Sequence, residues 1–124
     1  MAAELILIVE DNPRNAKLAR DVLQFSGFRT IEADNALDGM ALAESQHPAL
    51  ILMDIQLPGI DGVSALLRLR ELPATATIPV VALTAFAMAG DRDRFLAAGF
   101  AGYLVKPIDI KLFAEQVREY CRPA

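Results

Sequence analysis

The sequence has 124 residues, of which 54% are hydrophobic and 23% are charged, a balance typical of one folded domain rather than a disordered chain. The formal net charge of -4 disfavours partners that require clustered Lys and Arg, such as nucleic acids and anionic membrane surfaces. No apolar run approaches the roughly 20 residues that cross a bilayer, and the single cysteine, Cys121, excludes an internal disulfide and a cysteine-rich zinc site. We therefore expect one cytoplasmic domain, residues 1–124, with no membrane insertion and with proteins as its partners.

Short apolar runs alternate with stretches of helical character along the chain. The strands are expected at residues 5–9, 29–33, 50–53, 80–83 and 103–105. The first, third and fourth are almost continuously apolar, as central strands covered on both faces are, whereas the second is mixed and suits an edge. The alternation predicts an α/β fold with a doubly wound parallel sheet.

Caps and apolar spacing place the helices. Asn12 followed by Pro13 predicts an N-cap and a first helical residue, and Gly27 ends that helix, while His47 before a proline predicts a helix C-cap. The apolar positions expected to face the core of the first, third and last helices are Leu18, Val22, Leu23 and Phe25; Val63, Leu66 and Leu67, in phase with Arg70; and Leu112, Phe113 and Val117.

The fourth helix is expected between Phe86 and Gly99 and is the weakest of the set. It would contain Gly90 as an interior residue, which costs about 1 kcal/mol relative to alanine. The charged run at residues 91–94 is expected to be a solvated face. A marginal helix of this kind is easy to displace.

Polar side chains follow the expected strands at the point where each strand ends. Glu10 and Asp11 follow the first strand, Asp54 the third, Thr84 the fourth and Lys106 the fifth. Because the carboxyl ends of parallel strands meet at one edge of a sheet, we expect these side chains to converge. Any one of them alone would be an ordinary turn, cap or surface residue, so the prediction depends on the whole set.

Three neighbouring carboxylates repel one another unless a cation lies between them. Oxygen ligands without nearby His or Cys favour Mg2+, with Mn2+ as a substitute, and Asp11 and Asp54 are the expected direct ligands. With the charge neutralised, Asp54 can attack a phosphoryl donor and form an aspartyl phosphate. Lys106 would stabilise the transferring group, and the Thr84 hydroxyl would donate to a phosphoryl oxygen.

Four motifs occur in order, each at the end of an expected strand: Ile8-Val9-Glu10-Asp11-Asn12, Leu52-Met53-Asp54-Ile55-Gln56-Leu57-Pro58 with Asp61-Gly62, Leu83-Thr84-Ala85, and Tyr103-Leu104-Val105-Lys106-Pro107. With these motifs the chain resembles the receiver domain of two-component response regulators over essentially its whole length. The resemblance implies a flavodoxin-like, three-layer α/β/α fold with five strands in the order 2-1-3-4-5 and five helices.

The same resemblance assigns roles to individual residues. It implies that Asp54 is the phosphoacceptor and that Asp11, Asp54 and the backbone carbonyl of Gln56 bind Mg2+, with Glu10 helping through water. It also implies a cis peptide bond before Pro107 and an aromatic switch at Tyr103, which would move as Thr84 is drawn toward the phosphoryl group. Partners would then distinguish the two states on the face formed by the fourth helix, fifth strand and fifth helix.

The region from Thr84 to Asp91 is similar to a subgroup that includes receivers of hybrid sensor kinases and stand-alone regulators of bacterial cell division. The resemblance implies a sensor histidine kinase or histidine phosphotransfer protein as phosphodonor, a downstream protein target, and a monomer or weak phosphorylation-dependent dimer. Phe86 replaces a residue that is often polar in the family, which predicts slow self-dephosphorylation.

Several alternative functions remain open at this point. The chain could be a stand-alone regulator, a phosphorelay shuttle, or a receiver excised from a hybrid histidine kinase. A Mg2+-dependent phosphohydrolase is disfavoured, because such enzymes resemble a pattern with a second Asp at the position of Gln56 and usually carry a cap domain. A receiver that works without phosphorylation is disfavoured by the complete set of Glu10, Asp11, Asp54, Thr84 and Lys106. The expected class is a signalling protein and not an enzyme with an external substrate.

Overall fold

Strands and helices alternate along the chain in the computed structural model, which describes residues 3–57, 59–85 and 90–121. The strands are β1 (Leu5–Val9), β2 (Arg29–Ala33), β3 (Leu50–Asp54), β4 (Val80–Thr84) and β5 (Gly102–Val105). The helices are α1 (Pro13–Phe25), α2 (Ala36–Gln46), α3 (Gly62–Glu71), α4 (Asp91–Ala98) and α5 (Phe113–Cys121). The predicted alternation is therefore confirmed, and β3 and β4 each extend one residue further than predicted, through Asp54 and Thr84.

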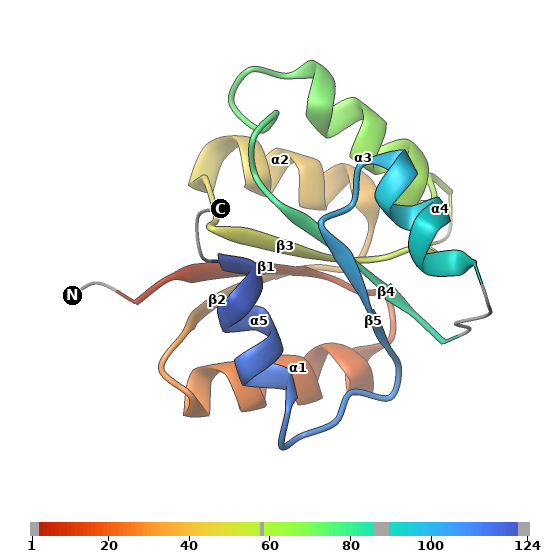
Figure 1. Cartoon of the computed structure of the whole chain (residues 1–124). Helices are drawn as coiled ribbons and strands as arrows, with labels where there is room; N and C mark the ends of the chain where they lie inside the picture. The colour runs from red at the N-terminus through yellow and green to blue at the C-terminus, as the bar shows by residue number, and fades with distance from the viewer. Residues whose placement is uncertain (1–2, 58, 86–89, 122–124) are drawn as a thin grey trace.

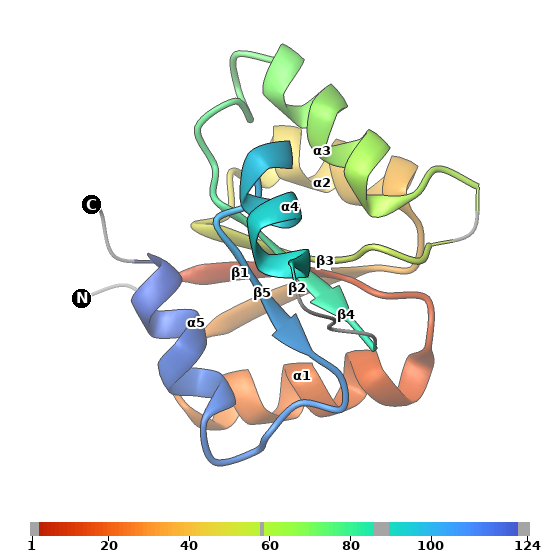
Figure 2. The ribbon, with the colours of Figure 1, turned by 45° about the vertical axis from the view of Figure 1, so that its right-hand side comes forward.

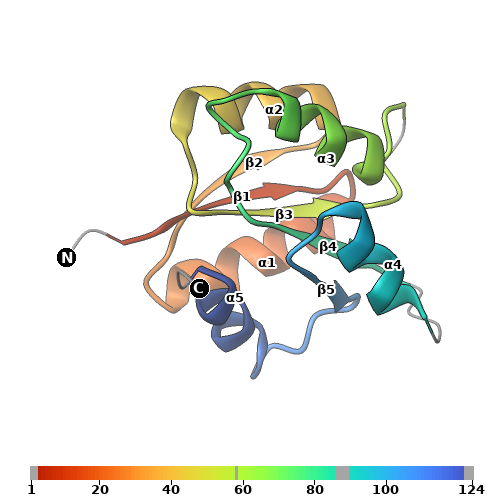
Figure 3. The same cartoon turned by 45° about the horizontal axis from the view of Figure 1, so that its top comes forward.

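The strands form one parallel sheet in the order β2-β1-β3-β4-β5. Helices α1 and α5 lie on one face, and α2, α3 and α4 lie on the other (Figures 1 and 3). This is the predicted three-layer fold with the predicted strand order. Because every pair is parallel, the carboxyl ends of all five strands meet at one edge of the sheet.

The sheet separates two apolar layers, because successive strand residues point to opposite faces. In one layer, side chains from the strands pack against α2, α3 and α4. These strand residues are Leu7, Val9, Ile51, Met53, Val80 and Ala82. In the other layer, strand side chains pack against α1 and α5. These strand residues are Ile6, Ile8, Leu50, Leu52, Val81 and Leu83. The three central strands are buried on both faces and β2 lies at an edge, as their compositions predict.

Two helix ends follow the local sequence signals. The Asn12 side chain accepts hydrogen bonds from the backbone N–H groups of Arg14 (2.9 Å) and Asn15 (3.2 Å), so α1 begins with the predicted cap. Gly27 follows the C-cap with φ +96°, a backbone conformation that favours glycine. His47 is the C-cap of α2, with φ +49° and its N–H donating to Ala43, as predicted.

The predicted helix faces are partly wrong. Phe25, Leu67 and Leu112 are 94%, 53% and 48% exposed, although each was expected to face the core. Leu23, Leu66, Phe113 and Val117 are buried as predicted. The other buried positions of α1 and α3 lie outside the predicted set and are mostly small: Ala16, Ala19, Gly62, Ala65 and Leu69. Small side chains allow a helix to approach the sheet closely, so hydrophobicity alone selects the wrong positions.

The start of α4 also differs from the prediction. Gly90 lies before the helix, in the left-handed region at φ +89°, and is not an interior residue. Asp91 is buried at the first helical position and its Oδ1 pairs with Arg94 Nη2 at 2.6 Å, so the charged run is not wholly solvated. An acidic residue there also suits the positive end of the helix dipole. Phe86 and Met88 lie outside the described residues.

Within the described ranges, the helices are all too short or too polar to cross a lipid bilayer.

Candidate functional site

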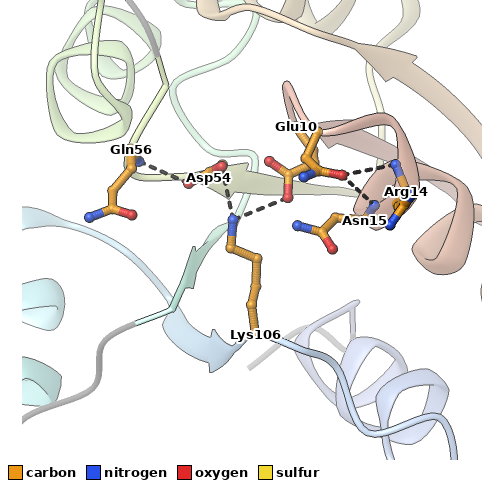
Figure 4. A network of polar contacts seen from close by, with 7 residues as sticks. Glu10, Arg14, Asn15, Asp54, Gln56 and Lys106 are labelled. Atoms are coloured by element: carbon orange, nitrogen blue, oxygen red, sulfur yellow. Dashed lines mark hydrogen bonds and ion pairs between the residues drawn. The ribbon is translucent and has the colours of Figure 1, made fainter.

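The predicted site residues meet at the carboxyl edge of the sheet. Glu10 follows β1, Asp54 ends β3, Thr84 ends β4 and Lys106 follows β5. The side chains of Glu10, Asp54 and Lys106 point toward one another across this edge (Figure 4). Figure 2 shows how the ends of β4 and β5 lie beside the start of α1 at the same edge. The topology therefore assembles groups that are up to 96 positions apart in the chain.

Lys106 joins two buried carboxylates. Its Nζ donates to Asp54 Oδ2 at 3.0 Å and to Glu10 Oε1 at 3.1 Å. The carboxylate side chains are only 3% and 1% exposed, and the lysine side chain is 15% exposed. Burial lowers the pKa of Lys106, but the hydrogen bonds to Asp54 and Glu10 outweigh it and raise that pKa above its ordinary value. The ammonium therefore stays charged and offsets the repulsion between the two carboxylates.

Asp54 is held as a carboxylate. Its Oδ1 accepts a hydrogen bond from the backbone N–H of Gln56 at 2.8 Å, while Oδ2 accepts from Lys106. Burial raises its pKa, but the neighbouring Glu10 carboxyl group and the hydrogen bonds from the Gln56 backbone and Lys106 together hold the pKa below the ordinary value. An ionised and oriented carboxylate is the form that a nucleophile requires.

Glu10 has the opposite character. Burial, followed by the nearby Asp54 carboxylate, raises its pKa from 4.5 to about 7, although Lys106 opposes the change. Among the side-chain atoms that the structure describes, Glu10 Oε2 is the buried oxygen without a hydrogen-bond partner. A buried oxygen of this kind is costly unless a further positive or donating group completes its environment.

The unfolding free energy of the metal-free protein is expected to decrease as pH rises from about 4.5 to about 7. In this window folded Glu10 retains a proton that the unfolded chain has released, so a rise in pH favours unfolding. The lowered pKa of Asp54 acts below this window and the raised pKa of Lys106 above it. Urea denaturation in a chelating buffer at several pH values measures the slope, and Glu10→Gln should flatten it. An unchanged slope in that variant would contradict the assignment to Glu10.

The residues present fit a divalent metal ion. Glu10, Asp11 and Asp54 bring one carboxylate oxygen each to within 4.8 Å of one another, and Asp11 is exposed at the rim. The donors are hard oxygens, which suit Mg2+, and the unpartnered Glu10 Oε2 belongs to the same cluster. Gln56 lies in the turn after β3, two residues beyond Asp54, and its backbone N–H contacts the Asp54 carboxylate. Its backbone carbonyl therefore belongs to the same turn as one of the three acidic residues.

Thr84 ends β4, the strand that pairs with β3 beside Asp54, and Tyr103 lies in β5, on the other side of β4. Thr84 is 1% exposed, and its backbone carbonyl accepts from the Lys106 N–H at 2.7 Å. Tyr103 is half-buried in β5 with its ring 5.6 Å from that of Phe95 in α4. The peptide bond between Lys106 and Pro107 is cis, as the resemblance implies.

Sequence reasoning assigned no role to two residues that surround the site, although one of them, Gly62, belongs to a motif quoted above. Gly62, the first residue of α3, packs directly on the backbone that follows the phosphoacceptor candidate. A Cβ there would lie 2.8 Å from the Asp54 carbonyl oxygen and 2.7 Å from Ile55 Cα. A glycine directly after the N-cap Asp61 is a usable signal for such close packing. Phe95, the ring that contacts Tyr103, carried no comparable signal.

Comparison with protein families decides the class. Residues 6–118 match the family described as Response regulator receiver domain. The chain belongs to this family. The match spans nearly all of the sheet and its helices.

Individual relatives of this receiver are similar along almost their whole length. The polar-differentiation response regulator DivK of Brucella ovis is 44% identical over 115 residues, which cover 93% of this chain and 94% of DivK. The receiver domain of sensor histidine kinase PA1611 from Pseudomonas aeruginosa PAO1, solved with magnesium in its active-site cleft, is 35% identical with TM-score 0.86, covering 97% of this chain and 98% of that one. A response regulator of Chloroflexus aurantiacus J-10-fl is 28% identical with TM-score 0.88, covering 96% and 98%.

Proposed function

We propose that this receiver is a phosphorylation-dependent signalling switch that accepts a phosphoryl group on Asp54 in a Mg2+-dependent reaction. The observation that carries the proposal is the convergence of one buried, ionised carboxylate, two further acidic side chains and one ammonium at the carboxyl edge of the sheet. Family membership and a magnesium-containing relative support the same function.

The chemistry assigned to this chain's residues is phosphoryl transfer. An Asp54 carboxylate oxygen attacks the phosphorus of the donor, and the bond from phosphorus to the donor's nitrogen or oxygen breaks, with the electron pair leaving on the donor. The Lys106 ammonium, which contacts Asp54 before the reaction, then stabilises the negative charge of the transferred phosphoryl group. The Thr84 hydroxyl donates a hydrogen bond to a phosphoryl oxygen. Mg2+ held by Asp11, Asp54 and the Gln56 carbonyl, with Glu10 acting through water, would supply charge neutralisation.

The signal is proposed to leave the site through β4 and β5. Thr84 ends β4 and Tyr103 lies in β5, and the Tyr103 ring already contacts Phe95 of α4. Movement of Thr84 toward the phosphoryl group would shift the population of Tyr103 positions and with it the surface of α4, β5 and α5. Leu96 of α4 and Val105 of β5 are 41% and 45% exposed, which gives this surface apolar contacts for a partner.

The remaining assignments follow from the family. We propose a bacterial sensor histidine kinase or histidine phosphotransfer protein as donor, a protein as downstream target, and the cytoplasm as location, with residues 1–124 acting as one receiver unit. A role in cell-cycle regulation is proposed from the likeness to DivK. Slow self-dephosphorylation remains a prediction from Phe86.

Intact-mass analysis after incubation with acetyl phosphate and Mg2+ is expected to show one added phosphoryl group. Removing Mg2+ with a chelator should abolish the adduct, because the three acidic side chains then repel the incoming anion. Asp54→Asn should also abolish it, since no other described residue occupies the nucleophile position. An Asp61→Asn variant, which alters an acid that caps α3, is the matched control and should retain the adduct. An adduct that persists in Asp54→Asn, or that forms equally well without metal, would contradict the proposal.

A further inference from the structure

A groove opens between α1 and the segment leading into α5, away from the site described above. Its volume is about 460 Å³, and its lining is Asp21, Val22, Phe25, Ser26, Ile110, Lys111 and Ala114. Helices α1 and α5 contact each other beside it, as Figures 1 and 2 show. None of the proposed phosphorylation residues lines this groove.

The rim of the groove carries two strongly exposed apolar side chains. Phe25 is 94% exposed and Ile110 is 62% exposed. Phenylalanine is normally buried, and exposed apolar groups that adjoin a groove commonly mark an interaction surface. The face therefore presents a projecting aromatic ring and an apolar hollow side by side.

Because the exposed Phe25 ring and the groove lie on the same face, two copies related by a two-fold axis can each insert this ring into the groove of the other. In such an isologous contact the same patch is used by both copies, so each Phe25 enters the groove of the other. A second copy of this chain thus removes both rings from water at once.

The groove carries one negative and one positive side chain, so the charges of two copies can also complement each other. Asp21 of α1 and Lys111 before α5 both line it. Asp21 already contacts Lys17 at 2.6 Å and Arg20 at 3.5 Å, whereas the Lys111 ammonium has no carboxylate partner among the residues that the structure describes. In a two-fold arrangement that seats each Phe25 in the other copy's groove, Lys111 of one copy would face Asp21 of the other. Exposed pairs of this kind add little affinity but select register and partner.

We propose that this chain forms a two-fold homodimer through the face made by Phe25, Ile110, Asp21 and Lys111. The association does not require phosphorylation of Asp54 and goes beyond the proposed function. It also differs from a phosphorylation-dependent dimer, because none of the residues of the Asp54 site takes part.

Sedimentation analysis of the unphosphorylated chain over a range of concentrations provides the first test. The wild type is expected to show a reversible dimer, and Phe25→Ala and Ile110→Ser should each weaken it at least about tenfold by removing a central apolar contact. Both side chains are largely exposed in the monomer, so at concentrations where all the proteins are monomeric these variants should keep the wild-type thermal stability. Leu37→Ala, which removes a 59% exposed leucine from α2 on the other face of the sheet, is the matched control and should dimerise normally.

A charge exchange tests the two-fold geometry itself. Asp21→Lys and Lys111→Glu each place like charges opposite one another in a homodimer, so each variant alone should be mostly monomeric. An equimolar mixture restores both opposite-charge pairs and should give a heterodimer. A wild type that stays monomeric at every concentration, or a dimer that is indifferent to Phe25→Ala, would overturn the proposal. A mixture that fails to associate while the wild type dimerises would overturn the two-fold arrangement.

Discussion

Replacing Lys106 with methionine is expected to reduce the unfolding free energy of the metal-free protein by about 3 kcal/mol, because the change leaves two buried carboxylates without their cation. The same variant should take up phosphoryl groups at least about a hundredfold more slowly, since a donor aimed at the transferring group is lost. Urea denaturation measures the first effect and time-resolved intact-mass analysis measures the second.

Mg2+ gives this prediction an internal control. Added Mg2+ should stabilise Lys106→Met more than it stabilises the wild type, because the ion and the lysine neutralise the same carboxylates. Arg68→Met, at an exposed position of α3, is the matched surface variant and should change stability by no more than about 0.5 kcal/mol. In Asp54→Asn/Lys106→Met the stability loss should be smaller than the sum of the single losses, because the two side chains interact directly. Additive losses would argue against a functional ion pair.

Replacing Gly62 with alanine is expected to destabilise the fold by about 2 kcal/mol, although alanine normally favours a helix. The added Cβ would meet two backbone atoms, the Asp54 carbonyl oxygen and Ile55 Cα, and neither can move without shifting the end of β3. Phosphoryl uptake should therefore fall together with stability. Chemical denaturation and the acetyl phosphate assay measure the two effects.

Gly39→Ala is the matched control for this substitution. Gly39 also lies within a helix, but an added Cβ there meets only the side chain of Val9, nearest at Cγ2 and 2.8 Å away. A side chain can yield more readily than a backbone, so the stability loss should be smaller than for Gly62→Ala. Equal losses in the two variants would show that proximity to the Asp54 backbone has no special cost.

Much of the fold could be predicted because its signals are local. Apolar runs marked all five strands, and their composition separated the buried central strands from the edge strand β2. Asn12, Gly27 and His47 marked helix ends through their own hydrogen bonds and backbone angles. The polar residues at the strand ends could be grouped for the same reason, since parallel strands deliver their carboxyl ends to one edge.

The helix faces were less predictable, because they depend on how closely each helix approaches the sheet. Phe25 and Leu67 are apolar but exposed, while alanines at neighbouring positions are buried. Gly102 shows the same limit in β5, where a Cβ would overlap the ring of Tyr120 from α5. Contacts between elements far apart in the sequence leave no periodic pattern.

The amino-acid sequence by itself determined the order of strands and helices, the chemical inventory of the site and its expected place at the sheet edge. Only the tertiary structure decided which of the acidic side chains is kept ionised and which has a raised pKa. Lys106 lies between Asp54 and Glu10, so that one carboxyl group is kept ionised while the pKa of the other rises to about 7. That division depends on burial and on distances between atoms at the ends of three separate strands, and these arise only when the sheet has formed.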